Sequence, residues 1–238
     1  MSDVDQASSK YWQQSTKASG IFSRSVNNSA FATANFVYVR YCSSDAWMGN
    51  TFMWQEEFRG APTIYAVFDD LMTNMGLAAG AKLLFGGCSA GARGAMVHLD
   101  NVVAMLAKQG IEARGLLDSG LWIDVQPVTN TGMGGTLLKQ AQDVYAFANV
   151  TSVISEACAA AYPGEEYKWC VVLVCCFRCL PDASLTAHAS LFGQYRMPFV
   201  QSDYFMSMSQ FDDFQTKCVW IARACCCNWP DAPIHLQL

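Results

Sequence analysis

The sequence predicts an α/β fold, because short apolar strands alternate along the chain with longer helical segments. The central evidence is a strand expected over residues 81–85, a helix over 92–108 and a second strand over 113–118. Strands that alternate with helices form a mostly parallel sheet covered on both faces. The expected architecture is therefore a three-layer sandwich.

The remaining elements follow from similar patterns. Three further strands are expected from runs of apolar or β-forming residues, at 36–41, 171–177 and 198–202. Two further helices are expected, at 62–75 and at 137–161, the second interrupted near Asn149. Residues 50–59 are expected to form a polar loop or hairpin, and residues 1–20 a polar N-terminal segment. Residues 21–238 then form a single domain.

Composition narrows the function classes. The chain has 238 residues, of which 52% are hydrophobic and 15% charged, and this supports one substantial core. A net charge of −5 argues against a nucleic-acid partner, because phosphate binding requires a basic surface. No apolar run reaches the roughly 18 residues of a membrane span, so none is expected.

Eleven cysteines are a high number for this length. A structural zinc site usually needs two spaced pairs, and Cys176 with Cys179 supplies one pair without an obvious second. Zinc is therefore the weaker interpretation, and no metal is expected. The odd total leaves at least one thiol outside intrachain disulfides. Cys88 is expected to be a buried free thiol.

Ser89 is the strongest candidate for a catalytic residue. It is the centre of Gly87-Cys88-Ser89-Ala90-Gly91, between the strand at 81–85 and the helix at 92–108. Flanking glycines allow the sharp turn that raises a nucleophilic serine above the sheet. The helix N-terminus behind it stabilises negative charge. An ordinary glycine-rich turn between strand and helix is the alternative.

The residues around this turn resemble the pectin acetylesterase/Notum family of carboxylesterases. The resemblance covers residues 18–215 and rests on four segments in the family's order: 40–49 (RYCSSDAWMG), 86–100 around Ser89, 117–124 (LDSGLWID) and 210–215 (QFDDFQ). It implies an α/β-hydrolase-like fold and a serine esterase, which requires no cofactor. It also implies a secreted protein with disulfides, in which Cys158, Cys170 and one of Cys175 and Cys176 are the expected participants.

The catalytic acid and base are harder to assign. In this fold class the chain order is serine, acid, histidine. Asp212 is the expected acid, with Asp213 and Asp203 as competitors. His235 is the only histidine after Asp212, so it is the expected base, although the family's histidine normally has a cysteine-containing setting. His98 lies on the serine's own helix, roughly 13 Å along its axis, and is too distant.

The oxyanion hole is incomplete in the sequence. The backbone N–H of Ala90 supplies one donor, but the family's GGGWC-type loop has no counterpart before Arg40. Loss of one oxyanion donor costs a rate factor of about 10² to 10³. An inactive or fragmentary family member, with a binding role or none, is therefore the alternative to an active esterase.

The resemblance also suggests how substrate is bound. The expected substrate is an O-acyl ester, foremost an O-acetyl ester of a polysaccharide such as pectin, and the family's other branch deacylates a protein. Trp47, Asp118 and Trp122 are the expected substrate contacts, with a core position as the equal alternative for the two tryptophans. A monomer is expected. Residues 1–5 (MSDVD) are acidic and polar and show no signal peptide.

Overall fold

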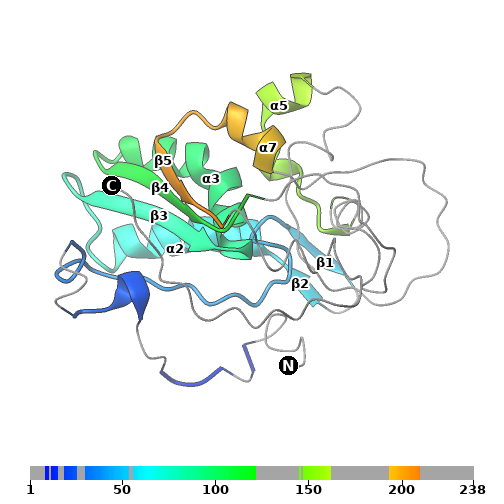
Figure 1. Cartoon of the computed structure of the whole chain (residues 1–238). Coiled ribbons are helices and arrows are strands. Elements are labelled where there is room, and N and C mark those ends of the chain that lie inside the picture. The colour runs from blue at the N-terminus through cyan, green and yellow to red at the C-terminus, as the bar shows by residue number, and fades with distance from the viewer. Residues whose placement is uncertain are drawn as a thin grey trace, which may run out of the picture.

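The computed structural model describes residues 9–10, 12–15, 19–25, 30–53, 56–121, 145, 147–161 and 193–209. A three-stranded parallel sheet is at the centre, in the order β3 (Lys82–Cys88), β4 (Glu112–Asp118) and β5 (Tyr204–Ser207), as Figure 1 shows. Helix α3 (Ala90–Ala107) connects β3 to β4. The predicted α/β fold is confirmed.

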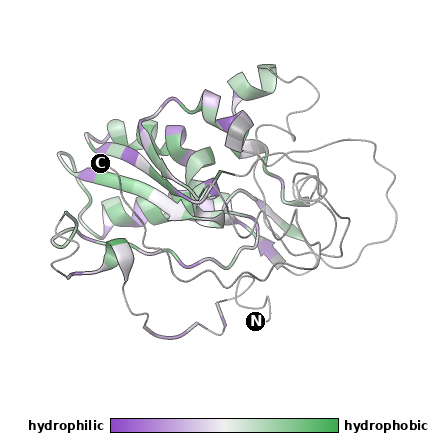
Figure 2. Cartoon of the chain, in the orientation of Figure 1, coloured by the Kyte–Doolittle hydropathy of each residue, from purple (hydrophilic) through white to green (hydrophobic). Residues whose placement is uncertain are grey.

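One face of the sheet packs against helices. Leu83 and Phe85 of β3 point toward this face, where they contact a buried cluster that includes Val102 and Leu106 of α3. Helix α2 (Gly60–Thr73) joins the same cluster through Ile64 and Phe68. In Figure 2 both helices carry hydrophobic and hydrophilic residues, as expected for helices that bury one side.

The opposite face of the sheet is more exposed. Leu84 is 45% exposed and Phe205 is 59% exposed. At the start of the strands this face carries charges, with Arg114 3.2 Å from Glu112 and 3.9 Å from Asp203. These pairs are exposed and therefore contribute little to stability.

A short antiparallel hairpin precedes α2. Strands β1 (Thr51–Met53) and β2 (Glu56–Phe58) pair within the segment predicted as a polar loop or hairpin. The other short elements are η1 (Gly20–Phe22), η3 (Thr151–Val153), α5 (Glu156–Ala161), α7 (Gly193–Arg196) and η4 (Met197–Phe199). Within the helix predicted at 137–161, a turn at Asn149 precedes η3, which agrees with the predicted interruption. None of the helices described here is long and apolar enough to cross a membrane.

Two predicted strands are wrong. Residues 36–41 form no strand, and Val37 and Tyr38 are 52% and 65% exposed, so the alternating pattern is not used for pairing. Residues 198–202 lie in η4 and the loop after it, and the strand begins only at Tyr204. The backbone N–H groups of Gln201 and Ser202 donate to the carboxylate of Asp100. These two N–H groups therefore bind a side chain and do not pair with a neighbouring strand. The strand predicted at 171–177 lies outside the described residues.

Candidate active site

Ser89 occupies a sharp turn between β3 and α3. Its backbone has φ 53° and ψ −116°, a conformation that non-glycine residues rarely adopt. Its N–H donates to the carbonyl oxygen of Asp118 at 2.9 Å, and its carbonyl accepts from the N–H of Arg93 at 3.1 Å. The side chain is exposed. The turn thus presents a serine hydroxyl at the carboxyl edge of the sheet.

The two glycines of the turn have different roles. A Cβ placed on Gly87 would collide with the backbone of Gly91, so the strand and helix approach each other too closely for any side chain. A Cβ on Gly91 would meet nothing within 4 Å. The first glycine is therefore required by packing, and the second is not.

Ala90 begins helix α3 directly behind the serine. The first backbone N–H groups of a helix have no partner within the helix, and the helix dipole places positive potential there. The oxyanion that forms on an acyl carbonyl attacked by the Ser89 hydroxyl would lie close to these groups. This arrangement suits the oxyanion role expected of Ala90.

Cys88, Asp118 and Ser207 are aligned across the three strands at the same edge. The thiol of Cys88 hydrogen-bonds to the carboxylate of Asp118, and the hydroxyl of Ser119 donates to that carboxylate at 3.1 Å. Desolvation and the charge of Asp118 raise the pKa of the Cys88 thiol. Cys88 therefore stays protonated at neutral pH and does not compete with Ser89 as a nucleophile.

The prediction that Cys88 is buried is wrong, because its side chain is exposed. The alternation of side chains along β3 explains the difference, since Leu83, Phe85 and Gly87 turn toward the helices and Cys88 turns away.

Cys42 is also a free thiol, whereas Cys158 is buried and disulfide-bonded. Neither of the other two cysteines in the described ranges is its partner.

Asp212, His235 and Trp122 lie outside the described residues. The course of the chain nevertheless bears on Asp212. Strand β5 ends at Ser207, whose carbonyl accepts from Ser119 N–H at 2.7 Å. Because β5 runs parallel to β3, its last residue reaches the edge where Ser89 lies. Asp212 follows five residues later (212 − 207).

His98 is fully buried on α3. Its Nε2 lies 2.6 Å from the carbonyl oxygen of Trp47, and its Nδ1 lies 3.2 Å from the hydroxyl of Tyr65. Burial lowers the pKa of His98 to about 4, and the nearby Arg196 adds to this effect. Both ring nitrogens are occupied, so the imidazole is a structural link.

Asp45 organises the 40–49 segment. Its buried carboxylate accepts from the Ser43 hydroxyl at 2.5 Å and from the N–H groups of Trp47, Gly49 and Gly60 at 2.9, 3.0 and 2.7 Å. Gly60 is the first residue of α2, so the carboxylate also lies at a helix N-terminus. Burial raises the pKa of Asp45, and the hydrogen bonds lower it in part.

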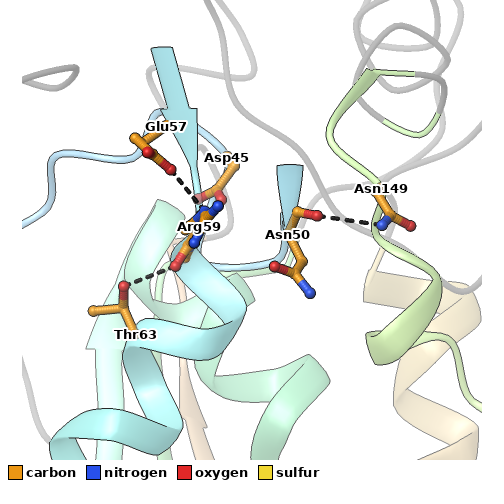
Figure 3. A network of polar contacts seen from close by, with 7 residues as sticks. Asp45, Asn50, Glu57, Arg59, Thr63 and Asn149 are labelled. Carbon is orange, nitrogen blue, oxygen red and sulfur yellow. Dashed lines mark hydrogen bonds and ion pairs between the residues drawn. The ribbon is translucent and has the colours of Figure 1, made fainter. Parts of the chain in front are cut away.

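Figure 3 shows Asp45 beside the junction of hairpin and helix. There the side chain of Arg59 pairs with Glu57 at 2.7 Å, and the carbonyl oxygen of Arg59 accepts from the hydroxyl of Thr63.

Trp47 is 7% exposed and packs in the cluster with α2 and α3. Its burial favours the core position, one of the two roles left open for it. Asp118, by contrast, is exposed at the sheet edge.

The described part of the chain holds no group of three or more His, Cys, Asp or Glu residues arranged to bind a metal ion. The cysteines considered for zinc, Cys176 and Cys179, lie outside it.

A family model described as Pectinacetylesterase matches residues 2–233, nearly the whole chain. The chain belongs to the pectinacetylesterase family. Two solved structures of the Wnt deacylase Notum from Drosophila are similar to it, with TM-scores of 0.72 and 0.70 and sequence identities of 25% and 27%. They cover 94% and 88% of this chain, which confirms the α/β-hydrolase-like fold expected for a member of this family.

The curated relatives of this chain, like the two solved structures, are Notum proteins. The palmitoleoyl-protein carboxylesterase notum1a of Danio rerio is 32% identical over 68% of this chain, and human NOTUM is 34% identical over 55%. The matched regions are 34% and 27% of those proteins. The two Drosophila chains are covered to 59% and 55%. The chain thus spans about a third or less of the curated relatives and somewhat over half of the solved ones.

Proposed function

We propose that this chain is a serine carboxylesterase in which Ser89 attacks the carbonyl carbon of an O-acyl ester. The observation that carries the proposal is the strained, exposed Ser89 between β3 and the N-terminus of α3. That geometry exposes the hydroxyl and places helix amides behind it. Membership in the pectinacetylesterase family supports the same chemistry.

The proposed reaction has two steps. A histidine, proposed to be His235 oriented by Asp212, takes the proton of the Ser89 hydroxyl as the hydroxyl oxygen bonds to the acyl carbon. The N–H of Ala90 stabilises the oxyanion, and the alcohol leaves with the proton. Water then attacks the acyl-serine with the same histidine as base, which releases the acid and restores Ser89.

The substrate class has two candidates. The family description supports an O-acetyl ester of a polysaccharide such as pectin. The names of the curated relatives, palmitoleoyl-protein carboxylesterases, support a protein that carries a longer acyl chain. In both cases Asp118 and Trp122 are proposed to contact the substrate, and Asp118 lies exposed at the edge that Ser89 shares.

Secretion is part of this proposal. The family resemblance implies it, and the disulfide-bonded state of Cys158 supports it, because disulfides persist in oxidising compartments. The protein is proposed to act as a monomer without a cofactor.

The test compares the hydrolysis of p-nitrophenyl esters of acetate, octanoate and palmitate by the wild-type chain, Ser89→Ala and Cys88→Ala. Wild type and Cys88→Ala are expected to be active, and Ser89→Ala is expected to lose activity by about 10³-fold or more. A rate that peaks at acetate supports the polysaccharide ester, and one that rises with chain length supports the acylated protein.

A fluorophosphonate probe tests the inactive alternative, because it labels only a serine that a base has activated. Labelling at Ser89 in the folded wild-type chain supports the esterase. A folded chain that is neither labelled nor faster than Ser89→Ala would establish the inactive family member instead.

A further inference from the structure

Asn149 stands in the triplet Asn149-Val150-Thr151, which has the pattern Asn-x-Ser/Thr of an N-glycosylation acceptor. Of the nine asparagines in the chain, only Asn27, in Asn27-Asn28-Ser29, has the same pattern. Such triplets also arise by chance, so the pattern alone decides nothing. The structural setting of Asn149 has to show whether the folded chain can carry a glycan there.

Asn149 is exposed, and the residues directly before and after it are buried. Ala148 is 1% exposed and Val150 is fully buried, and both belong to the core cluster of the sheet. The carbonyl of Ala148 accepts from the N–H of Asn50 at 2.8 Å. The backbone on either side is thus held in the fold, while the side chain of Asn149 is directed to the surface.

The local backbone explains this orientation. Asn149 has φ 49°, in the left-handed region that asparagine tolerates better than most residues, and η3 begins two residues later. Figure 3 shows its side chain beside Asn50, with Nδ2 3.2 Å from the carbonyl oxygen of Asn50. This hydrogen bond is exposed to solvent.

The hydrogen bond is compatible with modification. In N-glycosylation the Nδ2 atom bonds to C1 of a sugar, the bond from C1 to a lipid-linked diphosphate breaks, and one amide proton leaves. A carboxamide nitrogen carries two protons, so the glycosylated nitrogen keeps one. That proton can donate to the carbonyl of Asn50, so the modification does not by itself remove this hydrogen bond.

We propose that Asn149 is an N-glycosylation site, modified by transfer of an oligosaccharide from a lipid diphosphate donor when the chain enters the secretory pathway. This rests on the secretion proposed above. A glycan here covers the surface around Asn50 and Asn149. A macromolecular substrate therefore approaches Ser89 without docking on that surface.

The competing explanation is that asparagine is present only because it suits the left-handed turn. Position 151 separates the two explanations. Thr151→Ala destroys the acceptor triplet but leaves the Asn149 side chain unchanged, and Thr151→Ser keeps the triplet. Both are made with Asn27→Gln, so that the second triplet carries no glycan.

The experiment expresses the full chain behind a cleavable signal peptide in a eukaryotic cell and treats the secreted protein with peptide N-glycosidase F. A mobility shift is expected for Asn27→Gln alone and with Thr151→Ser, but not with Thr151→Ala. Mass spectrometry should find Asn149 converted to aspartate by the enzyme. An unshifted, folded Asn27→Gln chain, or an unmodified Asn149 peptide, overturns the site.

Esterase assays on the same preparations keep the two proposals distinguishable. A glycosylated Asn149 in a chain without Ser89-dependent hydrolysis supports the site and removes the catalytic proposal. Hydrolysis by a secreted chain with unmodified Asn149 does the reverse. An unmodified Asn149 in protein purified from its natural source overturns the glycosylation proposal regardless of activity.

Discussion

The Nε2 atom of His98 lies 2.6 Å from the carbonyl oxygen of Trp47, a residue 51 positions earlier in the chain. A carbonyl oxygen only accepts hydrogen bonds, so Nε2 carries the proton. Nδ1 then accepts from the hydroxyl of Tyr65. A neutral His98 therefore joins the helix of Ser89 both to the 40–49 segment and to α2.

This neutral state predicts acid sensitivity. Burial lowers the pKa of His98 from 6.5 to about 4, so between these values the unfolded chain binds a proton that the folded chain does not. The free energy of unfolding should fall as the pH drops from about 6.5 to about 4, by about 3 kcal/mol. Urea unfolding at several pH values measures this.

His98→Gln is the matched control, because glutamine can donate to Trp47 but does not titrate. Its unfolding free energy is expected to depend less on pH than that of the wild type over the same interval. Equal slopes for the two proteins would show that His98 is not the group responsible.

Asp45→Asn should destabilise the fold strongly. Each carboxylate oxygen accepts two hydrogen bonds, and the amide nitrogen of asparagine would instead face two donors. At least one buried N–H then loses its partner, and we expect a loss of about 3 kcal/mol. Asp69→Asn on the exposed side of α2 should change stability by less than about 0.5 kcal/mol. A similar, small loss in both variants would contradict the role of Asp45.

The parts of the fold that the sequence predicted well are those decided locally. The strand, turn and helix around Ser89 follow from apolar runs and two glycines, and hydrophobic periodicity continues through β3, α3 and β4. The strand predicted at 198–202 was misplaced because the donors there bind Asp100, about a hundred residues earlier. Periodicity contains no signal for such a long-range contact.

In the candidate site, too, local features could be predicted from the sequence and long-range contacts could not. The sharp turn at Ser89 was predicted because it depends on five consecutive residues, and the role of Ser89 as nucleophile stays a prediction. The links through Asp45 and His98 were missed, since their partners lie 15 and 51 residues away. One signal was present: His98 stands among apolar residues, which indicates a buried side chain with a hydrogen-bond partner, but not which partner.

The two glycines of the turn should respond differently to substitution. Gly87→Ala would drive a Cβ into the backbone of Gly91, whose carbonyl oxygen would be 2.6 Å away. We expect a loss of about 3 kcal/mol or more and no fluorophosphonate labelling. Gly91→Ala meets open space within a helix, where alanine is favoured by about 1 kcal/mol, and should retain fold and labelling. The reverse order in thermal unfolding and labelling would refute this account of the turn.

Asp100 is predicted to position Asp212, the proposed catalytic acid. It lies on the helix that begins behind Ser89, and its carboxylate accepts from Gln201 N–H at 3.0 Å and from the N–H and hydroxyl of Ser202 at 2.8 and 2.7 Å. These bonds hold the residues that lead into β5, and Asp212 follows that strand. Asp100→Ala should lower kcat by about 10- to 100-fold with little change in KM for p-nitrophenyl acetate, because a displaced catalytic group costs about that much.

Asp100→Asn is the graded control, since it keeps one acceptor oxygen and should lose less activity. A merely structural role would lower Tm but leave kcat unchanged at temperatures where the chain is folded, and that outcome would remove Asp100 from the positioning of the site. The rate of fluorophosphonate labelling gives a second readout, because it reports the activation of Ser89 directly. It should decrease in the same order as kcat, from wild type through Asp100→Asn to Asp100→Ala.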